Sequence, residues 1–340
     1  MRAANTSKVK LWLGAFAGFY RPGVEEVRGL DAVSKFLYSA RSVILVISAQ
    51  AAIISGLLAL ADREYHLLPF LLVLAGLVAA HMISNLSNDY FGFKRGHDTP
   101  DSPRMRYTVH PMASGVLETK ILVTGLAILC AIGAAIIAYF IVERGWTAAA
   151  FATAGIALLF LYDAAPVPLK RIGLGEPAVF LVWGPLMVGG GYAMITGRVS
   201  ADAFWVSIPY GLAVMSILVG KHIDQREFDA RVGNRTLPVL LGERAARTLN
   251  IATLVAIYAT AAALVVAGRL TPFAALIALA LPRAARAVRI HLRPRPAAAP
   301  EDYVGWPLWY HRMCLEHNRL FGWMYIFGLA AGAIWPAARL

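Results

Sequence analysis

Long apolar runs dominate this sequence of 340 residues. A helix needs about 20 mostly apolar residues to cross a bilayer, and nine segments approach or exceed that length: 38–61, 67–87, 121–142, 147–163, 177–196, 203–220, 248–267, 271–288 and 320–337. Apolar residues make up 59% of the chain and charged residues 15%, more apolar mass than soluble cores of this size bury. The sequence therefore predicts an all-α polytopic membrane protein with about nine transmembrane helices in one bundle, and it excludes a soluble enzyme.

The basic residues are distributed unequally between the two sides of such a bundle. The chain carries 32 Lys and Arg and a net charge of +12. When the runs alternate in direction, the N-terminal side holds all of these cations except Arg63, Arg144, Arg198, Arg269 and Arg339. Cytoplasmic loops are enriched in Lys and Arg. We therefore expect an integral protein of the cell inner or plasma membrane with a cytoplasmic N-terminus, and no nucleic-acid partner is needed to explain the charge.

The chain divides into a short leading segment and one large membrane domain. Residues 1–35 are expected to form a cytoplasmic or interfacial segment, in which residues 11–20 favour a short interfacial stretch over a signal sequence. Residues 36–340 form the transmembrane domain. The connections after the second and sixth runs are about thirty residues long, a length that usually indicates function. Both are expected to lie on the cytoplasmic side.

The first of these connections begins with a polar cluster. One helical stripe, at i, i+4, i+7 and i+8, contains His81, Asn85, Asn88 and Asp89. Asp98 follows after Gly92 and Gly96, which allow the chain to bend back. A solvated helix end would also explain acids at this position. The depth of His81 and Asn85 favours a site, because polar groups inside a membrane span are costly unless they face the protein interior.

A second cluster occupies the matching position after the sixth run. Lys221, Asp224 and Gln225 share a helix face, and Asp229 follows one turn later. A charged interfacial turn is the alternative, but two acidic clusters at the same depth favour a shared site. Carboxylates in a basic setting suit Mg²⁺ together with substrate phosphate oxygens. Opposed clusters of this kind can neutralise a diphosphate leaving group, which predicts a lipidic diphosphate with its tail among the helices.

These clusters resemble the two Asp-rich motifs of the UbiA superfamily of intramembrane prenyltransferases, and most closely the 1,4-dihydroxy-2-naphthoate prenyltransferase branch. The first motif is Asn85-x-x-Asn88-Asp89-Tyr90 with Gly96-x-Asp98. Supporting segments are Met112–Gly115, Leu161-Tyr162 through Pro166, Leu174–Glu176, Gly184-Pro185, Asp229–Gly233, Arg235–Pro238 and Gly242. The chain departs from the usual motifs at Gly92 and Gln225, where an Asp is expected in each.

The resemblance implies a helical bundle around a central cavity and Mg²⁺-dependent transfer of a prenyl chain from a prenyl diphosphate to an aromatic, quinone-precursor-like acceptor. The catalytic residues implied are Asp89, Asp98, Asp224 and Asp229, which would also hold Mg²⁺, together with Tyr162. The substrate-binding residues implied are Asn85, Asn88, Arg41, Lys94, Lys170, Lys221 and Arg226.

Two other functions fit parts of the pattern. An intramembrane terpene cyclase would use the same cation chemistry without an acceptor, and altered motifs are compatible with it. A transporter is disfavoured because the acids lie at one surface rather than at the midplane and no inverted repeat is detectable. The segment 301–319 would either cover the cavity mouth or, as its aromatic residues favour, form an interfacial belt.

Overall fold

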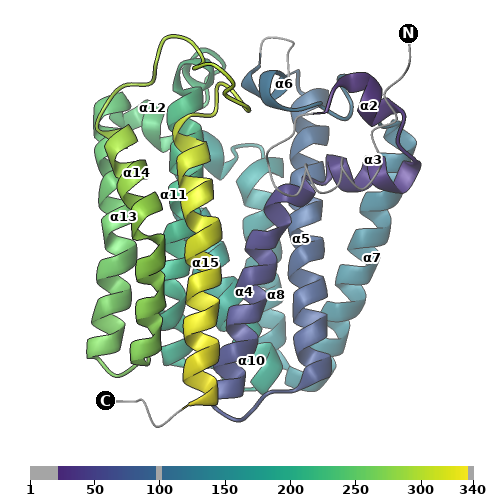
Figure 1. Ribbon diagram of the computed structural model, residues 1–340. Helices are drawn as coiled ribbons and strands as arrows, with labels where there is room; N and C mark the ends of the chain where they lie inside the picture. Colours follow the sequence, from purple (N-terminus) through teal and green to yellow (C-terminus); the bar gives the residue numbers. More distant parts are fainter. Residues whose placement is uncertain (1–21, 97–101, 336–340) are drawn as a thin grey trace.

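The described part of the molecule is one bundle of upright helices (Figure 1). The computed structural model describes residues 22–96 and 102–335, apart from the side chains of residues 163 and 164. The predicted interfacial stretch 11–20 and the predicted ligand Asp98 lie outside the described residues. Within them every regular element is a helix, as the sequence predicts.

Among the described residues, six helices are long and apolar enough to cross a membrane. They are α4 (Ser42–Ala61), α5 (Leu67–Lys94), α7 (Thr119–Arg144), the continuous α9 (Gly175–Leu181), η3 (Val182–Gly189) and α10 (Gly190–Thr196), α11 (Ala201–Arg231) and α13 (Glu243–Val266). Each coincides with a predicted apolar run. The class of polytopic helical membrane protein is therefore confirmed.

The other three apolar runs are also helical. They form α8 (Trp146–Leu159) with η1 (Phe160–Ala164), η4 (Pro272–Ala280) with α14 (Leu281–His291), and α15 (Tyr310–Ile334). Figure 1 shows α14 and α15 standing beside the longer spans. These three are shorter, interrupted or more polar than the six, so nine membrane crossings remain a prediction.

Several helix ends differ from the predicted ends. The second and sixth runs were expected to stop at residues 87 and 220, but α5 continues to Lys94 and α11 to Arg231. The apolar pattern marks only the part of each helix at membrane depth, and the polar residues that follow continue the same helix beyond it. Likewise α15 begins ten residues earlier than position 320, and Arg312 and Glu316 pair across one turn of this added part.

Short helices cover the end of the bundle from which α5 and α11 project. They are α2 (Val24–Arg28), α3 (Ala32–Ser39), α6 (Pro103–Tyr107), η2 (Leu169–Arg171) and α12 (Leu237–Leu241). Val27 and Leu30 pack against Val109 and Val116, which joins the leading segment to the connection after α5. Asp31 caps α3, since its carboxylate accepts the Ser34 backbone N–H at 2.9 Å.

α11 lies at the centre of the bundle and packs against α13, α15, η3 and α4. A Cβ on Gly211 would lie 3.0 Å from Gly184 Cα, and one on Gly220 would lie 3.0 Å from the His311 backbone nitrogen. Small residues at these points let neighbouring backbones approach closely, which is how helices associate in lipid. The arrangement holds the polar end of α11 at a fixed distance from its neighbours.

His81, predicted to face the interior, is buried within the bundle. Its Nδ1 lies 2.8 Å from Ser48 Oγ, and its ring meets the Trp183 ring edge-on. Trp183 also donates from Nε1 to the Ser48 hydroxyl at 3.2 Å. These contacts satisfy the imidazole inside the span, so this part of the polar stripe stabilises packing.

Candidate active site

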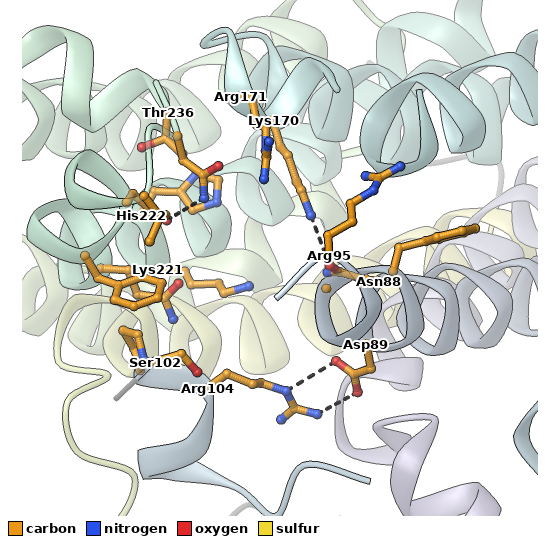
Figure 2. Close-up of a pocket in the computed structure, with 18 of the residues that line it drawn as sticks. Asn88, Asp89, Arg95, Ser102, Arg104, Lys170, Arg171, Lys221, His222 and Thr236 are labelled. Atoms are coloured by element: carbon orange, nitrogen blue, oxygen red, sulfur yellow. Dashed lines mark hydrogen bonds and ion pairs between the residues drawn. The ribbon is translucent and has the colours of Figure 1, made fainter. Parts of the chain in front are cut away.

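A polar pocket of about 120 Å³ opens where the extended ends of α5 and α11 face each other. Its lining comes from α5, α11, the α3–α4 junction, α6, η1 and η2, and the connection after α11. The charged lining residues described by the structure are six cations, Arg41, Arg95, Arg104, Lys170, Arg171 and Lys221, and two acids, Asp89 and Asp229. Figure 2 shows Asp89 and Asn88 on one side and Lys221 and His222 on the other. The pocket is therefore strongly cationic.

On the α5 side, Asp89 is buried between two arginines. Arg104 donates from Nη2 to Asp89 Oδ2 at 2.8 Å, and Arg41 contacts Oδ1. Burial alone would lower the pKa of the Arg104 guanidinium, but the neighbouring Asp89 carboxylate outweighs it and raises that pKa. The Arg104 guanidinium is thus held charged at the pocket, and the Asp89 carboxylate fixes the positions of both arginine side chains.

Arg41 reaches Asp89 because the backbone turns sharply between α3 and α4. Arg41 has φ +60°, in the left-handed region. Asn85 supports this turn by donating from Nδ2 to the Ala40 carbonyl at 3.0 Å. Asn85 is absent from the pocket lining, so the structure gives this predicted substrate-binding residue a positioning contact behind Arg41.

On the α11 side, three successive turns place Lys221, Gln225 and Asp229 along the pocket. Asp229 Oδ1 accepts a hydrogen bond from Asn234 Nδ2 at 3.2 Å. Three buried oxygen atoms in this region have no hydrogen-bond partner among the described residues, namely Asp229 Oδ2, Asn234 Oδ1 and Thr236 Oγ1. Buried polar atoms are almost always paired in native proteins, so this group is set up for a ligand.

The connection between η1 and α9 closes a third side. Lys170 donates from Nζ to Asn88 Oδ1 at 3.0 Å, and the Arg171 carbonyl accepts the Arg235 backbone N–H at 3.1 Å. A Cβ on Gly175 would lie 3.0 Å from Lys170 Cα and 3.6 Å from the Tyr162 ring, so a glycine is needed for this approach. Tyr162 lies in the lining, beside Lys170.

Of the predicted site residues, the pocket brings together Arg41, Asn88, Asp89, Tyr162, Lys170, Lys221 and Asp229. It does not include Lys94 or Arg226. Lys94 is exposed, with its Nζ 6.0 Å from the centre of the Tyr90 ring. Lys94 lies five residues after Asp89 and Arg226 three residues before Asp229, and at these positions neither side chain lines the pocket.

Asp224 also lies away from the pocket. Its carboxylate accepts the backbone N–H groups of Tyr310 at 3.1 Å and of His311 at 2.9 Å, at the start of α15. Arg295 donates to the Asp224 carbonyl at 2.8 Å. The structure therefore gives this predicted metal ligand a different contact, one that ties α15 to α11.

Sequence reasoning missed several lining residues, among them Arg95, Arg104, Tyr107, Arg171, His222, Asn234 and Thr236. Burial favours the neutral phenol of Tyr107, but the cations Lys221 and Arg104 outweigh it and lower the pKa of Tyr107. Two arginines close together in a long loop, Arg104 and Arg106, could have indicated an anion-binding residue there. Only the fold distinguishes the two, since Arg104 faces Asp89 and Arg106 is exposed.

The donor atoms decide where Mg²⁺ fits. No group of three or more His, Cys, Asp or Glu side chains that could hold a metal occurs among the described residues. At Asp89 the carboxylate is already paired with two arginines. At Asp229 the unpartnered oxygens of Asp229, Asn234 and Thr236 offer the all-oxygen set that Mg²⁺ prefers, with positions left for water or phosphate. The residues present therefore fit Mg²⁺ on the α11 side.

The sequence matches the UbiA prenyltransferase family over residues 49–310. The chain belongs to this family. Its relatives include a 1,4-dihydroxy-2-naphthoate octaprenyltransferase of Bacillus subtilis, 27% identical over 72% of this chain and 78% of the relative. Another is the UbiA prenyltransferase domain-containing protein 1 of Dictyostelium discoideum, 28% identical over 65% of this chain and 66% of the relative. The predicted family and the predicted class of enzyme, a prenyltransferase, are thereby confirmed.

Solved structures agree with the fold. A UbiA homologue from Aeropyrum pernix K1 covers 83% of this chain and 96% of its own, with a TM-score of 0.62 at 18% identity. A UbiA homologue from Archaeoglobus fulgidus bound to GPP and Mg²⁺ covers 87% of this chain and 99% of its own, with a TM-score of 0.58 at 13% identity. The chain thus shares the helical architecture of the family over most of its length.

Proposed function

We propose that this UbiA-family enzyme transfers a prenyl chain from a prenyl diphosphate to an aromatic, quinone-precursor-like acceptor within the membrane. The observation that carries the proposal is the pocket at one end of an apolar bundle, whose described lining includes six cations and two carboxylates. A diphosphate complements that charge, and the bundle offers an apolar phase for the prenyl chain. The relatives named as naphthoate octaprenyltransferases support an acceptor of that class.

The cationic side chains perform the first step, which is binding the diphosphate. Arg41 Nε is buried and has no hydrogen-bond partner among the described residues, so it is a donor available to an anion. Lys170 and Lys221 approach from two other helical segments. Fixed charges in a partly desolvated pocket stabilise a leaving group without reorganising.

Mg²⁺ would be held by Asp229 with Asn234 and Thr236, and when bound it supplies positive charge that stabilises the departing diphosphate. Breaking the carbon–oxygen bond leaves its electron pair on the diphosphate and an allylic cation on the prenyl chain. An electron-rich ring carbon of the acceptor then attacks this cation, and the ring loses a proton. Tyr162 borders the pocket beside Lys170, where its phenol can orient the reacting groups. The surrounding lipid and apolar helices exclude water, which would otherwise capture the cation.

The decisive experiment incubates the purified protein with C10–C20 prenyl diphosphates and Mg²⁺, with and without dihydroxynaphthoate or hydroxybenzoate acceptors. We expect acceptor-dependent diphosphate release and a prenylated aromatic product. Diphosphate release with a cyclic hydrocarbon in the absence of acceptor would instead favour a terpene cyclase. Failure to consume any prenyl diphosphate would refute both functions.

Matched variants connect the activity to the pocket. Asp229→Asn should reduce turnover by a factor of about 100 or more, because it removes the charge of the group expected to hold Mg²⁺. Asp202→Asn is the control, since Asp202 lies in the first turn of the same helix and pairs with Arg269 at the exposed opposite end. Equal activity of the two variants would contradict the placement of the site.

A further inference from the structure

A second concentration of charge lies on the outside of the bundle, along the contact between α14 and α15. Arg312, Glu316 and Arg319 follow one face of α15 at i, i+4 and i+7, while Arg283 and Arg286 lie on α14. We call these five residues the arginine seam. None of them lines the pocket described above. The proposed reaction therefore does not account for this seam.

The contacts show how the seam is built. Arg283 donates from Nη1 to the Glu316 carbonyl at 2.8 Å, which joins α14 to α15. The Glu316 carboxylate forms an ion pair with Arg312, whose Nε lies 2.8 Å from Glu316 Oε1. No salt bridge reaches Arg283 or Arg286 from any residue that the structure describes, and both side chains are exposed. Arg283 and Arg286 thus present positive charge outward without an acidic partner among the described residues.

The position of this charge along the bundle is unusual. Arg283 lies about 12 Å along α14 from its end at His291, from the helical rise of 1.5 Å per residue. The surface from Arg283 toward the far end of the bundle is apolar. Leu279, one turn before Arg283, is 61% exposed, and Phe327, about 16 Å along α15 from Glu316, is 52% exposed. A bare guanidinium beside a lipid-facing surface is costly, and long cationic side chains reduce that cost by reaching toward the headgroups.

We propose that the arginine seam binds the phosphate of an anionic phospholipid, with the acyl chains lying over Leu279 and Phe327. Guanidinium groups recognise phosphate through two parallel hydrogen bonds, and basic clefts between membrane helices on the positively charged side bind anionic headgroups. The seam lies toward the same end of the bundle as the cation-rich loops, where α14 ends and α15 begins (Figure 1). This lipid site is independent of the substrate pocket and of the proposed reaction.

The test measures lipid retention by native mass spectrometry on the full-length protein in detergent, titrated with phosphatidylglycerol or phosphatidylcholine. We expect tighter binding of phosphatidylglycerol. Each arginine near a headgroup contributes a factor of about five, so Arg283→Gln with Arg286→Gln should weaken phosphatidylglycerol binding about 25-fold. Arg289→Gln is the matched control, because Arg289 is exposed on the same helix but bonds back to the Ala285 carbonyl. Its effect should stay below twofold.

A second measurement needs no variant and so does not depend on the double variant folding. Modification of arginines by phenylglyoxal is followed by peptide mass spectrometry in nanodiscs of each lipid. Phosphatidylglycerol should protect Arg283 and Arg286 relative to Arg289. Equal labelling in the two lipids, equal affinity for them, or equal losses in variant and control would overturn the proposal. A shift from dimer to monomer in the double variant, with lipid binding unchanged, would assign the seam to a contact between copies of the chain.

Discussion

Neutralising Asp224 and neutralising Asp229, the two aspartates of the second polar cluster, should change different properties of the protein. Asp229→Asn alters the pocket, whereas Asp224→Asn alters the start of α15. The Asp224 carboxylate accepts two backbone N–H groups there, and its side chain is fully buried. We therefore expect Asp224→Asn to destabilise the protein while leaving diphosphate binding within about threefold of the original value.

The magnitude follows from the contacts. A hydrogen bond to a charged group contributes about 1.5–3 kcal/mol, and an asparagine can accept only one of the two N–H groups well. The negative charge at the helix N-terminus adds about 0.3–1 kcal/mol. Removing a buried charge relieves part of its desolvation cost, so the net loss should be about 2 kcal/mol. That loss corresponds to a decrease in Tm on the order of 5 °C.

The chain provides its own reporter for this experiment. Cys314 is buried in α15, one turn from His311, whereas Cys130 is exposed on α7. In a Cys130→Ser background, a thiol-reactive fluorophore reports the temperature at which α15 leaves the bundle. Binding of inorganic pyrophosphate with Mg²⁺ is measured in parallel by calorimetry, with Asp229→Asn as the comparison. If Asp224→Asn keeps the original Tm but loses pyrophosphate binding as Asp229→Asn does, the assignment of Asp224 to α15 is refuted.

Three further predictions concern the pocket and the packing around it. Arg104→Met should weaken pyrophosphate binding about tenfold in calorimetry, because it removes a guanidinium from the pocket, while Arg106→Met should change it by less than twofold. The phenol of Tyr107 should ionise below its usual pKa of about 10 in ultraviolet titrations of wild type minus Tyr107→Phe. Lys221→Met should raise that pKa by removing a cation that stabilises the phenolate, and an unchanged titration would contradict this electrostatic account. Gly220→Ala should cost about 1–3 kcal/mol in thermal unfolding, since the added Cβ would lie 3.0 Å from backbone atoms of Tyr310 and His311; Gly133→Ala, with nothing within 4 Å, should be neutral or stabilising.

The sequence predicted much of the site because its signal is local. Asn85, Asn88 and Asp89 lie at i, i+3 and i+4 on α5, and Lys221 and Gln225 are one turn apart on α11, so helical spacing alone put each group on one face. The depth of both clusters at the ends of apolar runs then indicated that they face each other. These inferences required only the period of the helix and the length needed to cross a bilayer.

The arginines were harder to predict because their partners are distant in sequence. Arg41 and Arg104 both contact Asp89, 48 and 15 residues away, and neither spacing carries a helical period. Asp224 is a residue that the sequence assigned to the site and the structure places elsewhere, because its place in the motif resembles that of a metal ligand. Its partners, the backbone N–H groups of Tyr310 and His311, lie 86 and 87 residues away and have no side-chain signature at all.

The sequence by itself determined that this chain is a helical membrane protein whose acids gather at the cation-rich end. Apolar length and helical period are properties of a single segment. The bilayer then requires each apolar segment to be helical, because its backbone groups cannot bond to water there. Only the tertiary structure decided which cations pair with Asp89, which oxygens at and beside Asp229 have no partner among the described residues, and that Asp224 holds α15. Each of these outcomes depends on how helices far apart in sequence pack side by side, and that packing is set by close backbone approaches such as Gly184 on Gly211.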